Sequence, residues 1–149
     1  MSEEQLINTL RVCFPESTKS VSDSRMQEHL QRGQWYAETN VDGEMVGCVQ
    51  MDKGNIFSLC TMPAYRHKGV ATRLLNRVIH DIEEAGMVPC LNADHIGLVP
   101  FYEKFGFTRT KNLTMVKMPK KSPRYPIDVR DAIIGFLVVT LAAVITRRS

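Results

Sequence analysis

Residues 65–71, with the sequence YRHKGVA, combine basic side chains with a glycine at the start of a predicted helix. The first backbone N–H groups of a helix lack intrahelical partners and the helix dipole is positive there, so this turn can bind a phosphate ester through its main chain. Gly69 would let the ligand approach the backbone closely. The spacing is neither GxGxxG nor GxxxxGK-S/T, and a plain helix cap explains the same residues. Both interpretations remain open from this segment alone.

The cysteines do not form a metal-binding pattern. All four lie far apart without Cys-x-x-Cys or Cys/His spacing, at Cys13, Cys48, Cys60 and Cys90. Cys48 and Cys60 occur in apolar runs, which favours buried small side chains over ligands or nucleophiles. We therefore predict no metal site, and this cysteine usage fits a reducing compartment. The first residues lack the pattern of a secretory signal, so export is not expected.

The length of 149 residues suits one domain, and 44% hydrophobic with 23% charged residues is typical of a globular chain. The charge is unevenly distributed. Residues 1–116 carry 12 basic and 14 acidic side chains, whereas residues 117–149 carry 7 and 2. A nucleic-acid partner is disfavoured, because binding along a phosphate backbone requires clustered Lys and Arg on the folded body.

Hydrophobic spacing predicts a mixed α/β domain that ends at Met118. The clearest helix covers residues 69–85, between two predicted strands, and this order requires a parallel pair inside an otherwise antiparallel sheet. Pro15 should end the first helix, and Asp42-Gly43 suits a hairpin turn. The other predicted elements are helices at 6–13, 22–30 and 98–105, and strands at 34–40, 45–51, 56–62, 88–93, 107–109 and 113–118.

Two motifs occur in order along this domain. A predicted strand ends in LCTMP at residues 59–63, and residues 66–71, RHKGVA, then match the pattern Q/R-x-x-G-x-G/A before an apolar helix. Residues 101–107 have the sequence FYEKFGF. Because both motifs fall on elements predicted independently of them, the sequence resembles the GNAT acetyltransferase superfamily over roughly residues 6–118.

The resemblance implies a GNAT fold with an acetyl-CoA site where the two parallel strands splay apart. In this family the backbone of the 66–71 turn binds the pyrophosphate, and the strand edge at 59–61 pairs with the pantetheine arm. The acetyl group passes directly from the thioester to an amine, so Cys60 and Cys90 are not expected to be nucleophiles. The implied cofactor-binding residues are Leu59, Cys60, Thr61, Arg66, His67, Lys68, Gly69, Val70, Ala71 and His95.

Tyr102, in the second motif, matches the family tyrosine that protonates the thiolate leaving group. A phenol suits this role because it stays protonated at neutral pH, although a packing aromatic is the alternative. The expected donor to the oxyanion of the tetrahedral intermediate is a backbone N–H on the 59–61 strand.

Three departures from the family pattern matter. His95 replaces a frequent asparagine; it can contact the cofactor, move a proton, or lie in solvent at a helix start. Phe57, Ser58 and Cys90 supply no carboxylate base, so the amine loses its proton through water and backbone carbonyls or arrives neutral. The usual first edge strand is missing, which leaves a sheet edge open for a partner, for example in a homodimer.

The acceptor amine is not identified by the sequence. Glu38, Asp42 and Glu44, on or beside the first hairpin, would favour a cationic amine, but ordinary surface charge explains them as well. Two functions remain. The first is an N-acetyltransferase acting on a primary amine of a small molecule or a protein. The second is a catalytically silent acyl-CoA-binding or interaction module, and the intact motifs favour the enzyme.

Residues 132–146, AIIGFLVVTLAAVIT, contain no charged side chain and follow a basic, proline-containing linker at residues 119–131. As a helix they would span about 22 Å, short of the roughly 30 Å hydrocarbon core, but flanking arginines can snorkel. We favour a transmembrane tail anchor over a packed core strand, with the domain at residues 1–118 in the cytosol. The short span resembles anchors of the mitochondrial outer membrane; without an anchor the protein would be cytoplasmic.

Overall fold

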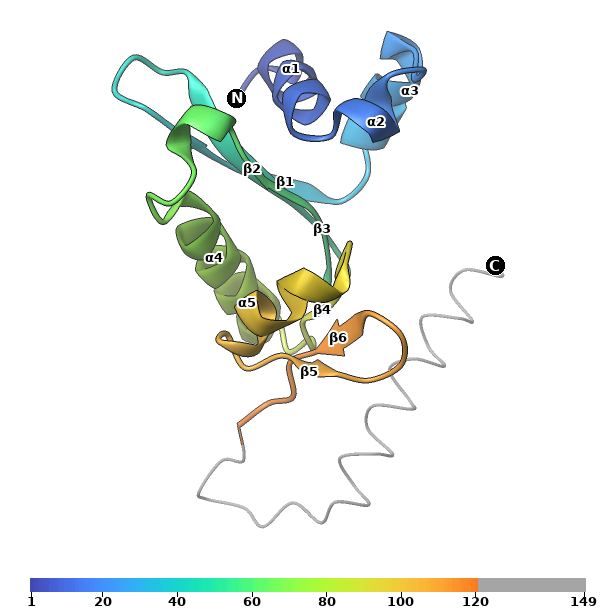
Figure 1. The fold of residues 1–149 in the computed structure, drawn as a ribbon, viewed down its shortest axis with the longest axis vertical. Helices are drawn as coiled ribbons and strands as arrows, with labels where there is room; N and C mark the ends of the chain where they lie inside the picture. Colours follow the sequence, from blue (N-terminus) through green and yellow to red (C-terminus); the bar gives the residue numbers. More distant parts are fainter. Residues whose placement is uncertain (121–149) are drawn as a thin grey trace. The chain divides into compact units, whose positions relative to one another are not determined.

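The computed structural model describes residues 1–120, and the compact unit within them is Met1–Met118. Six strands form one sheet in the order β1-β2-β3-β4-β6-β5 (Figure 1). The helices are α1 (Glu3–Cys13), α2 (Pro15–Thr18), α3 (Asp23–Leu30), α4 (Val70–Glu84) and α5 (Val99–Glu103). The strands are β1 (Gln34–Thr39), β2 (Met45–Asp52), β3 (Asn55–Thr61), β4 (Cys90–Asn92), β5 (Thr108–Arg109) and β6 (Thr114–Val116).

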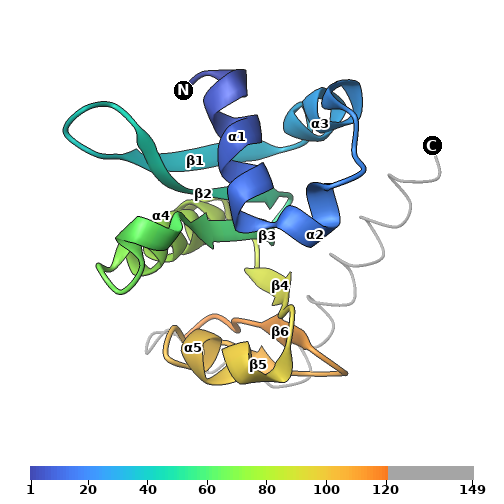
Figure 2. The ribbon, with the colours of Figure 1, turned by 45° about the horizontal axis from the view of Figure 1, so that its top comes forward.

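Two apolar clusters hold helices to the sheet. α4 packs on one face because its apolar side chains recur at helical spacing, and Leu75 and Ile82 are completely buried. α1 and α3 lie on the opposite face, as Figure 2 shows, where Leu10 packs with Cys48 and Cys60. The sheet is therefore covered on both faces, and two thiols lie in the cluster beneath α1.

The sheet is antiparallel except between β3 and β4. These two strands run parallel but pair at only two positions, Asn55 with Cys90 and Ile56 with Leu91. Beyond them β3 continues alongside β2 while β4 pairs with β6 (Figures 1 and 2). From Phe57 onward, the edge of β3 that faces the gap has no strand partner among residues 1–120. This arrangement confirms the predicted mixed sheet with a splayed parallel pair.

Several element boundaries differ from the predictions, and three of these differences have a clear physical reason. Pro15 ends α1 as expected, but it also begins α2, in a first turn where proline loses no hydrogen bond. The strand predicted at residues 88–93 is shorter in the structure. It consists of β4 alone, because only the three residues of β4 pair with β6. The helix predicted at 98–105 is a 3-10 turn at Ile96–Leu98 followed by α5. It ends before Gly106, whose φ of 91° a continuing helix does not allow.

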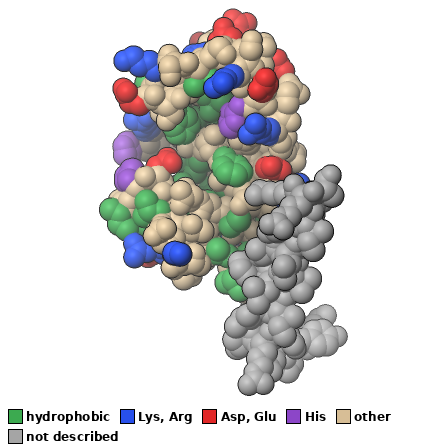
Figure 3. All heavy atoms as spheres, turned by 90° about the vertical axis from the view of Figure 1, so that its right-hand side faces the viewer, with side chains coloured by type: hydrophobic (Ala, Val, Ile, Leu, Met, Phe, Trp, Pro, Cys, Tyr) green, Lys and Arg blue, Asp and Glu red, His purple; other side chains and the backbone are tan. Residues whose placement is uncertain are grey.

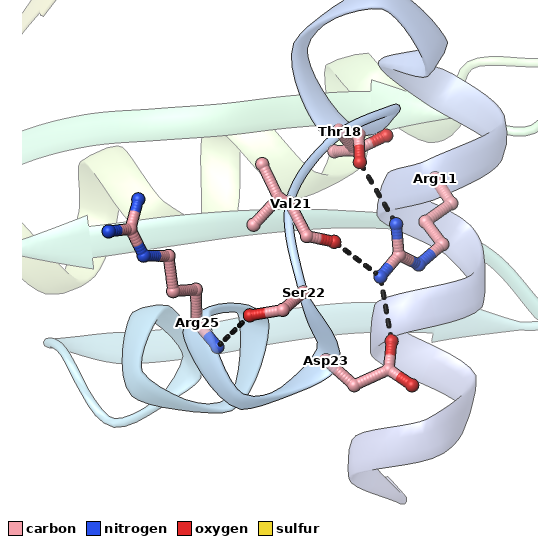
Figure 4. A network of polar contacts seen from close by, with 6 residues as sticks. All are labelled: Arg11, Thr18, Val21, Ser22, Asp23 and Arg25. Carbon is pink, nitrogen blue, oxygen red and sulfur yellow. Dashed lines mark hydrogen bonds and ion pairs between the residues drawn. The ribbon is translucent and has the colours of Figure 1, made fainter.

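Arg11 ties α1 to the segment between α2 and α3 (Figure 4). Its guanidinium donates hydrogen bonds to the carbonyls of Thr18 and Val21, both at 3.0 Å, and to Oδ1 of Asp23 at 2.7 Å. The Ser22 hydroxyl caps α3, as its sequence predicts. These contacts fix the position of α2, which forms part of the wall of the site described below.

The predictions for the C-terminal segment fall mostly outside the described part of the chain. Only the first two residues of the predicted linker at 119–131, and none of the apolar segment at 132–146, are among residues 1–120. Within residues 1–120, no helix combines the length and the apolar character needed to cross a bilayer.

Candidate active site

A β-bulge shapes β3 where it leaves β4. The register with β2 shifts between Cys48 and Gln50, so that two residues of β3, Ser58 and Leu59, lie opposite one residue of β2. Ser58 has a φ of 53°, a left-handed conformation that non-glycine residues seldom adopt. A bulge bends its strand, and this one coincides with the separation of β3 from β4. The bulge therefore helps to open the gap in the sheet.

The gap opens into a cleft of about 470 Å³. Its walls come from the end of α1, the free part of β3, the turn before α4, and α5. Eight of the ten predicted cofactor-binding residues line the cleft: Leu59, Cys60, Thr61, Arg66, His67, Gly69, Val70 and Ala71. Tyr102 also lines it, whereas Lys68 and His95 do not. The structure thus brings most of the predicted residues, but not all, into one cleft.

The turn before α4 presents free backbone donors to this cleft. His67 and Gly69 have positive φ angles of 63° and 80°, and Gly69 is the N-cap of α4 without a side-chain cap. The N–H of Arg73 donates to the Gly69 carbonyl at 3.0 Å, which leaves the N–H groups of residues 70–72 without a helical acceptor. Together with the positive end of the α4 dipole, these groups form a site suited to an anion.

Charged side chains surround this turn. Arg66 lines the cleft, and its Nε donates to the Thr61 carbonyl at 3.4 Å. Arg73 braces the turn from outside, because it donates to the Lys68 carbonyl at 3.0 Å and pairs with Glu38. On the face of the molecule shown in Figure 3, basic and acidic side chains are interspersed, and apolar side chains gather toward the middle.

Tyr102 projects from α5 into the wall of the cleft. Its ring is only 9% exposed and packs edge-to-face against Phe101 and Phe107, with ring centres 5.2 and 6.1 Å away. Burial, together with the negative charge of Asp94, raises the pKa of the Tyr102 phenol to about 12. Its hydroxyl makes no hydrogen bond within residues 1–120. The phenol is therefore protonated at neutral pH and free to donate.

A second cavity, of about 410 Å³, adjoins the cleft. The two share four lining residues, Phe14, Leu59, Asp94 and Tyr102. The rest of the second cavity is lined from α1, α2, the bulged part of β3 and β4, by Leu10, Ser17, Thr18, Ile56, Phe57, Ser58, Leu91 and Asn92. The splay therefore holds two spaces that meet beside the phenol.

Asp94, rather than His95, reaches both spaces. Asp94 follows β4 and lines the cleft and the second cavity. The His95 ring packs instead beside Gly97, with Nδ1 3.0 Å from the position of a Cβ there. A carboxylate base was expected only on the two parallel strands, so Asp94 was not among the predicted site residues. A usable signal was its place directly after Ala93, a small apolar residue that is buried just beyond β4.

The thiols near the cleft are poor nucleophiles. The Sγ atoms of Cys48 and Cys60 lie 3.4 Å apart in the core. A hydrogen bond with Cys13 lowers the pKa of the Cys60 thiol, but the hydrogen bond with Cys48 and burial outweigh it and raise this pKa to about 12. Burial also raises the pKa of Cys90. Because the thiolate is the reactive form, neither Cys60 nor Cys90 is suited to attack a thioester at neutral pH.

Comparison with known sequences identifies the domain. A family model described as an acetyltransferase (GNAT) domain matches residues 2–118. No curated protein sequence matches the chain closely enough to count as a relative.

Solved structures with the same fold include several acetyltransferases. An aminoglycoside 6'-N-acetyltransferase complexed with coenzyme A has a TM-score of 0.65 and 18% identity, with 80% of this chain and 93% of that chain covered. A GNAT family acetyltransferase from Staphylococcus aureus Mu50 has a TM-score of 0.62 and 14% identity, with 77% and 91% covered. A GNAT family N-acetyltransferase from Escherichia coli in complex with CoA has a TM-score of 0.60 and 18% identity, with 76% and 74% covered.

Proposed function

The chain belongs to the GNAT acetyltransferase family, as its two motifs indicate, and we propose that it transfers an acetyl group from acetyl-CoA to a primary amine. The observation that carries this proposal is the cleft itself. It joins a helix start with unpaired N–H groups, a free edge of β3 and the protonated phenol of Tyr102. Each of these features answers a separate need of the reaction.

The first need is to bind the acyl donor. The diphosphate of acetyl-CoA would accept hydrogen bonds from the N–H groups of residues 70–72, with Arg66 adding positive charge. The pantetheine amides would pair with the free backbone edge of β3 beyond Phe57, as a further strand would. The cleft is large enough for a ligand segment of this kind.

The second need is to stabilise the tetrahedral intermediate. The amine nitrogen forms a bond to the thioester carbon, and the carbonyl oxygen becomes an oxyanion. A backbone N–H of this part of β3, for example at the bulge residue Leu59, would stabilise it. As the C–S bond breaks, the Tyr102 hydroxyl would protonate the CoA thiolate.

The acceptor would bind in the second cavity. This space shares Leu59 and Tyr102 with the cleft, so an amine in it would meet a thioester beside the phenol. No carboxylate lies on the free part of β3. The ammonium would therefore lose its proton to water before the nitrogen attacks.

The test is CoA thiol release from acetyl-CoA with a panel of primary amines, with the N-acetyl products identified by mass spectrometry. Release that requires the amine, and an amide product that accumulates with it, are expected. Tight acetyl-CoA binding without any amide product would instead identify an acyl-CoA-binding or interaction module without catalysis.

We also propose that residues 132–146 insert in a membrane and hold the domain on its cytosolic side, for example at the mitochondrial outer membrane. Support comes from the sequence, since fifteen uncharged residues between basic flanks would bind a bilayer far more firmly than one acyl chain. The test is carbonate extraction of the full-length protein and of residues 1–118. The full-length protein should stay with the membrane while the truncated one is soluble. Equal extraction of both, or an insoluble truncation, would place residues 132–146 in the folded core.

A partner at the free sheet edge is a further part of this proposal. Within residues 1–120, β1 pairs only with β2, so the outer edge of Gln34–Thr39 offers backbone groups to another strand. A homodimer formed through this edge would be detected by sedimentation. The variant Trp35→Pro should weaken it, because proline has no backbone N–H to donate to a partner strand. A monomer at all concentrations would contradict it.

A further inference from the structure

Asp94 is distinguished by its place in the splay. Among the described residues 1–120, it is the one carboxylate that lines either the cleft or the second cavity, and it lines both. The second cavity contains no Lys, Arg or His among these residues. A cation entering this cavity therefore meets one negative charge and no positive one.

The other acidic candidates do not reach these spaces. Glu38 forms two hydrogen bonds with Nε of Arg73, at 3.0 and 3.2 Å, and its charge is thereby paired. Glu44 accepts a hydrogen bond from Asn40 at 2.8 Å within the hairpin. Asp42 is exposed in the hairpin turn, and none of the three acids lines the cleft or the second cavity. These acids therefore add no charge to the lining of the second cavity.

The rest of the second cavity has a mixed lining, in which Ser17, Thr18, Ser58 and Asn92 are polar and the other residues are mainly apolar. Phe14 and Phe57 contribute aromatic surface, and Leu10 and Leu91 contribute aliphatic surface. Phe57 is 48% exposed, which leaves its ring free to contact a ligand in this cavity. A volume of about 410 Å³ suits a small molecule. The aromatic and aliphatic part of this lining, together with Asp94, can accommodate a compact amine with an apolar body and one positive charge.

We propose that Asp94 binds the ammonium group of the acceptor and makes the second cavity a site for compact primary amines with one positive charge and an apolar body. This inference rests on the proposed function. An aspartate carboxylate is a much weaker base than an alkylamine. Asp94 therefore pairs with the ammonium and does not act as the base that removes the ammonium proton. The ammonium loses one proton to water before attack. The nitrogen then forms the C–N bond, the C–S bond breaks, Tyr102 protonates the thiolate, and the second amine proton restores the phenol.

The experiment compares two ligands with full-length protein saturated with CoA. One is 2-phenylethylamine, which is protonated at neutral pH, and the other is the neutral 2-phenylethanol of similar size. Calorimetry should show that Asp94→Asn weakens binding of the ammonium about fivefold, because a charge contact with an exposed carboxylate is lost. Binding of the alcohol should change less than about twofold. Asp94→Glu should retain most of the ammonium binding.

The matched control is Asp42→Asn, which removes an equal charge from the hairpin and should change neither affinity. Equal binding of the ammonium by the wild type and Asp94→Asn would overturn the inference, as would equal losses for both ligands or weakening by Asp42→Asn. Because binding is measured without acetyl transfer, it is independent of turnover. Asp94-dependent binding without any acetylated product would support this inference and contradict the proposed function.

Discussion

Asp94 and Tyr102 line the same two spaces, and the phenol of Tyr102 responds to the carboxylate of Asp94. Burial is the larger cause and the negative charge of Asp94 the second, and together they raise the pKa of Tyr102 to about 12. A phenol with this pKa stays protonated at neutral pH, so under the proposed function its proton is available as the C–S bond breaks. The relationship therefore links the proposed acceptor cavity to the proposed proton donor.

The first prediction concerns pH. Because the pKa of Tyr102 is raised to about 12, kcat should not fall between about pH 8 and about pH 10 through ionisation of this phenol. Asp94→Asn removes a negative charge that opposes phenolate formation, so it should lower the pKa of Tyr102. The pKa of Tyr102 in the Asp94→Asn variant can be measured from tyrosinate absorbance as a function of pH. The absorbance of the Asp94→Asn, Tyr102→Phe double variant is subtracted to isolate the signal of Tyr102. A Tyr102 pKa that is the same with Asp94 and with Asn at position 94 would contradict the prediction.

The second prediction concerns the hydroxyl of Tyr102. Tyr102→Phe keeps the ring contacts with Phe101 and Phe107 and removes only the proton donor. We expect acetyl-CoA affinity to be unchanged and kcat to fall about 10²- to 10⁴-fold. Phe101→Leu is a control for packing, since it changes the neighbouring ring without touching the hydroxyl. Equal kcat for wild type and Tyr102→Phe would show that Tyr102 has only a packing role.

The third prediction concerns the turn before α4. Gly69 has a φ of 80°, and a Cβ there would lie 2.9 Å from Nη1 of Arg73. Gly69→Glu adds this strain and places negative charge where the diphosphate should bind, so acetyl-CoA affinity measured by calorimetry should fall more than about tenfold. Gly43, which also has a φ of 80° but has open space around it, provides the control variant Gly43→Glu. An unchanged acetyl-CoA affinity in Gly69→Glu would show that acetyl-CoA does not bind at this turn.

The fourth prediction concerns the thiols. Cys60 lines the cleft, but its pKa is raised to about 12, so direct transfer is expected and no acetyl-enzyme should form. Intact-protein mass spectrometry after incubation with acetyl-CoA alone should show unmodified protein. Cys60→Ala should retain kcat within about threefold while losing about 1–2 kcal/mol of stability from the smaller side chain. A stoichiometric acetyl adduct that an added amine discharges would instead establish a covalent mechanism.

Much of the site could be predicted because it depends on local rules. The apolar face of α4, the glycine before it and the motif at residues 101–107 are each encoded within a short segment. The strand–helix–strand order then fixes the parallel pair β3–β4 and the cleft between them. Eight of ten predicted cofactor-binding residues line that cleft for this reason.

The remaining features depend on contacts between distant segments. The bulge at Ser58 arises from the register of β3 against β2, which no local pattern encodes. The choice between Asp94 and His95 depends on how the chain turns after β4. Of these two adjacent polar residues, Asp94 lines the cleft and His95 does not. The short helix α2 was missed because Pro15 is both a stop signal and a good first helical residue.

The central claim is that one splay in the sheet holds acetyl-CoA and an amine on either side of Tyr102. The most direct measurement incubates the protein with acetyl-CoA labelled in the acetyl carbonyl and with 2-phenylethylamine, and follows the label by mass spectrometry. The account predicts labelled N-acetyl product that forms with the wild type and is strongly reduced by both Gly69→Glu and Tyr102→Phe. Labelled product formed equally by all three proteins, or by none of them although acetyl-CoA is bound, would contradict it.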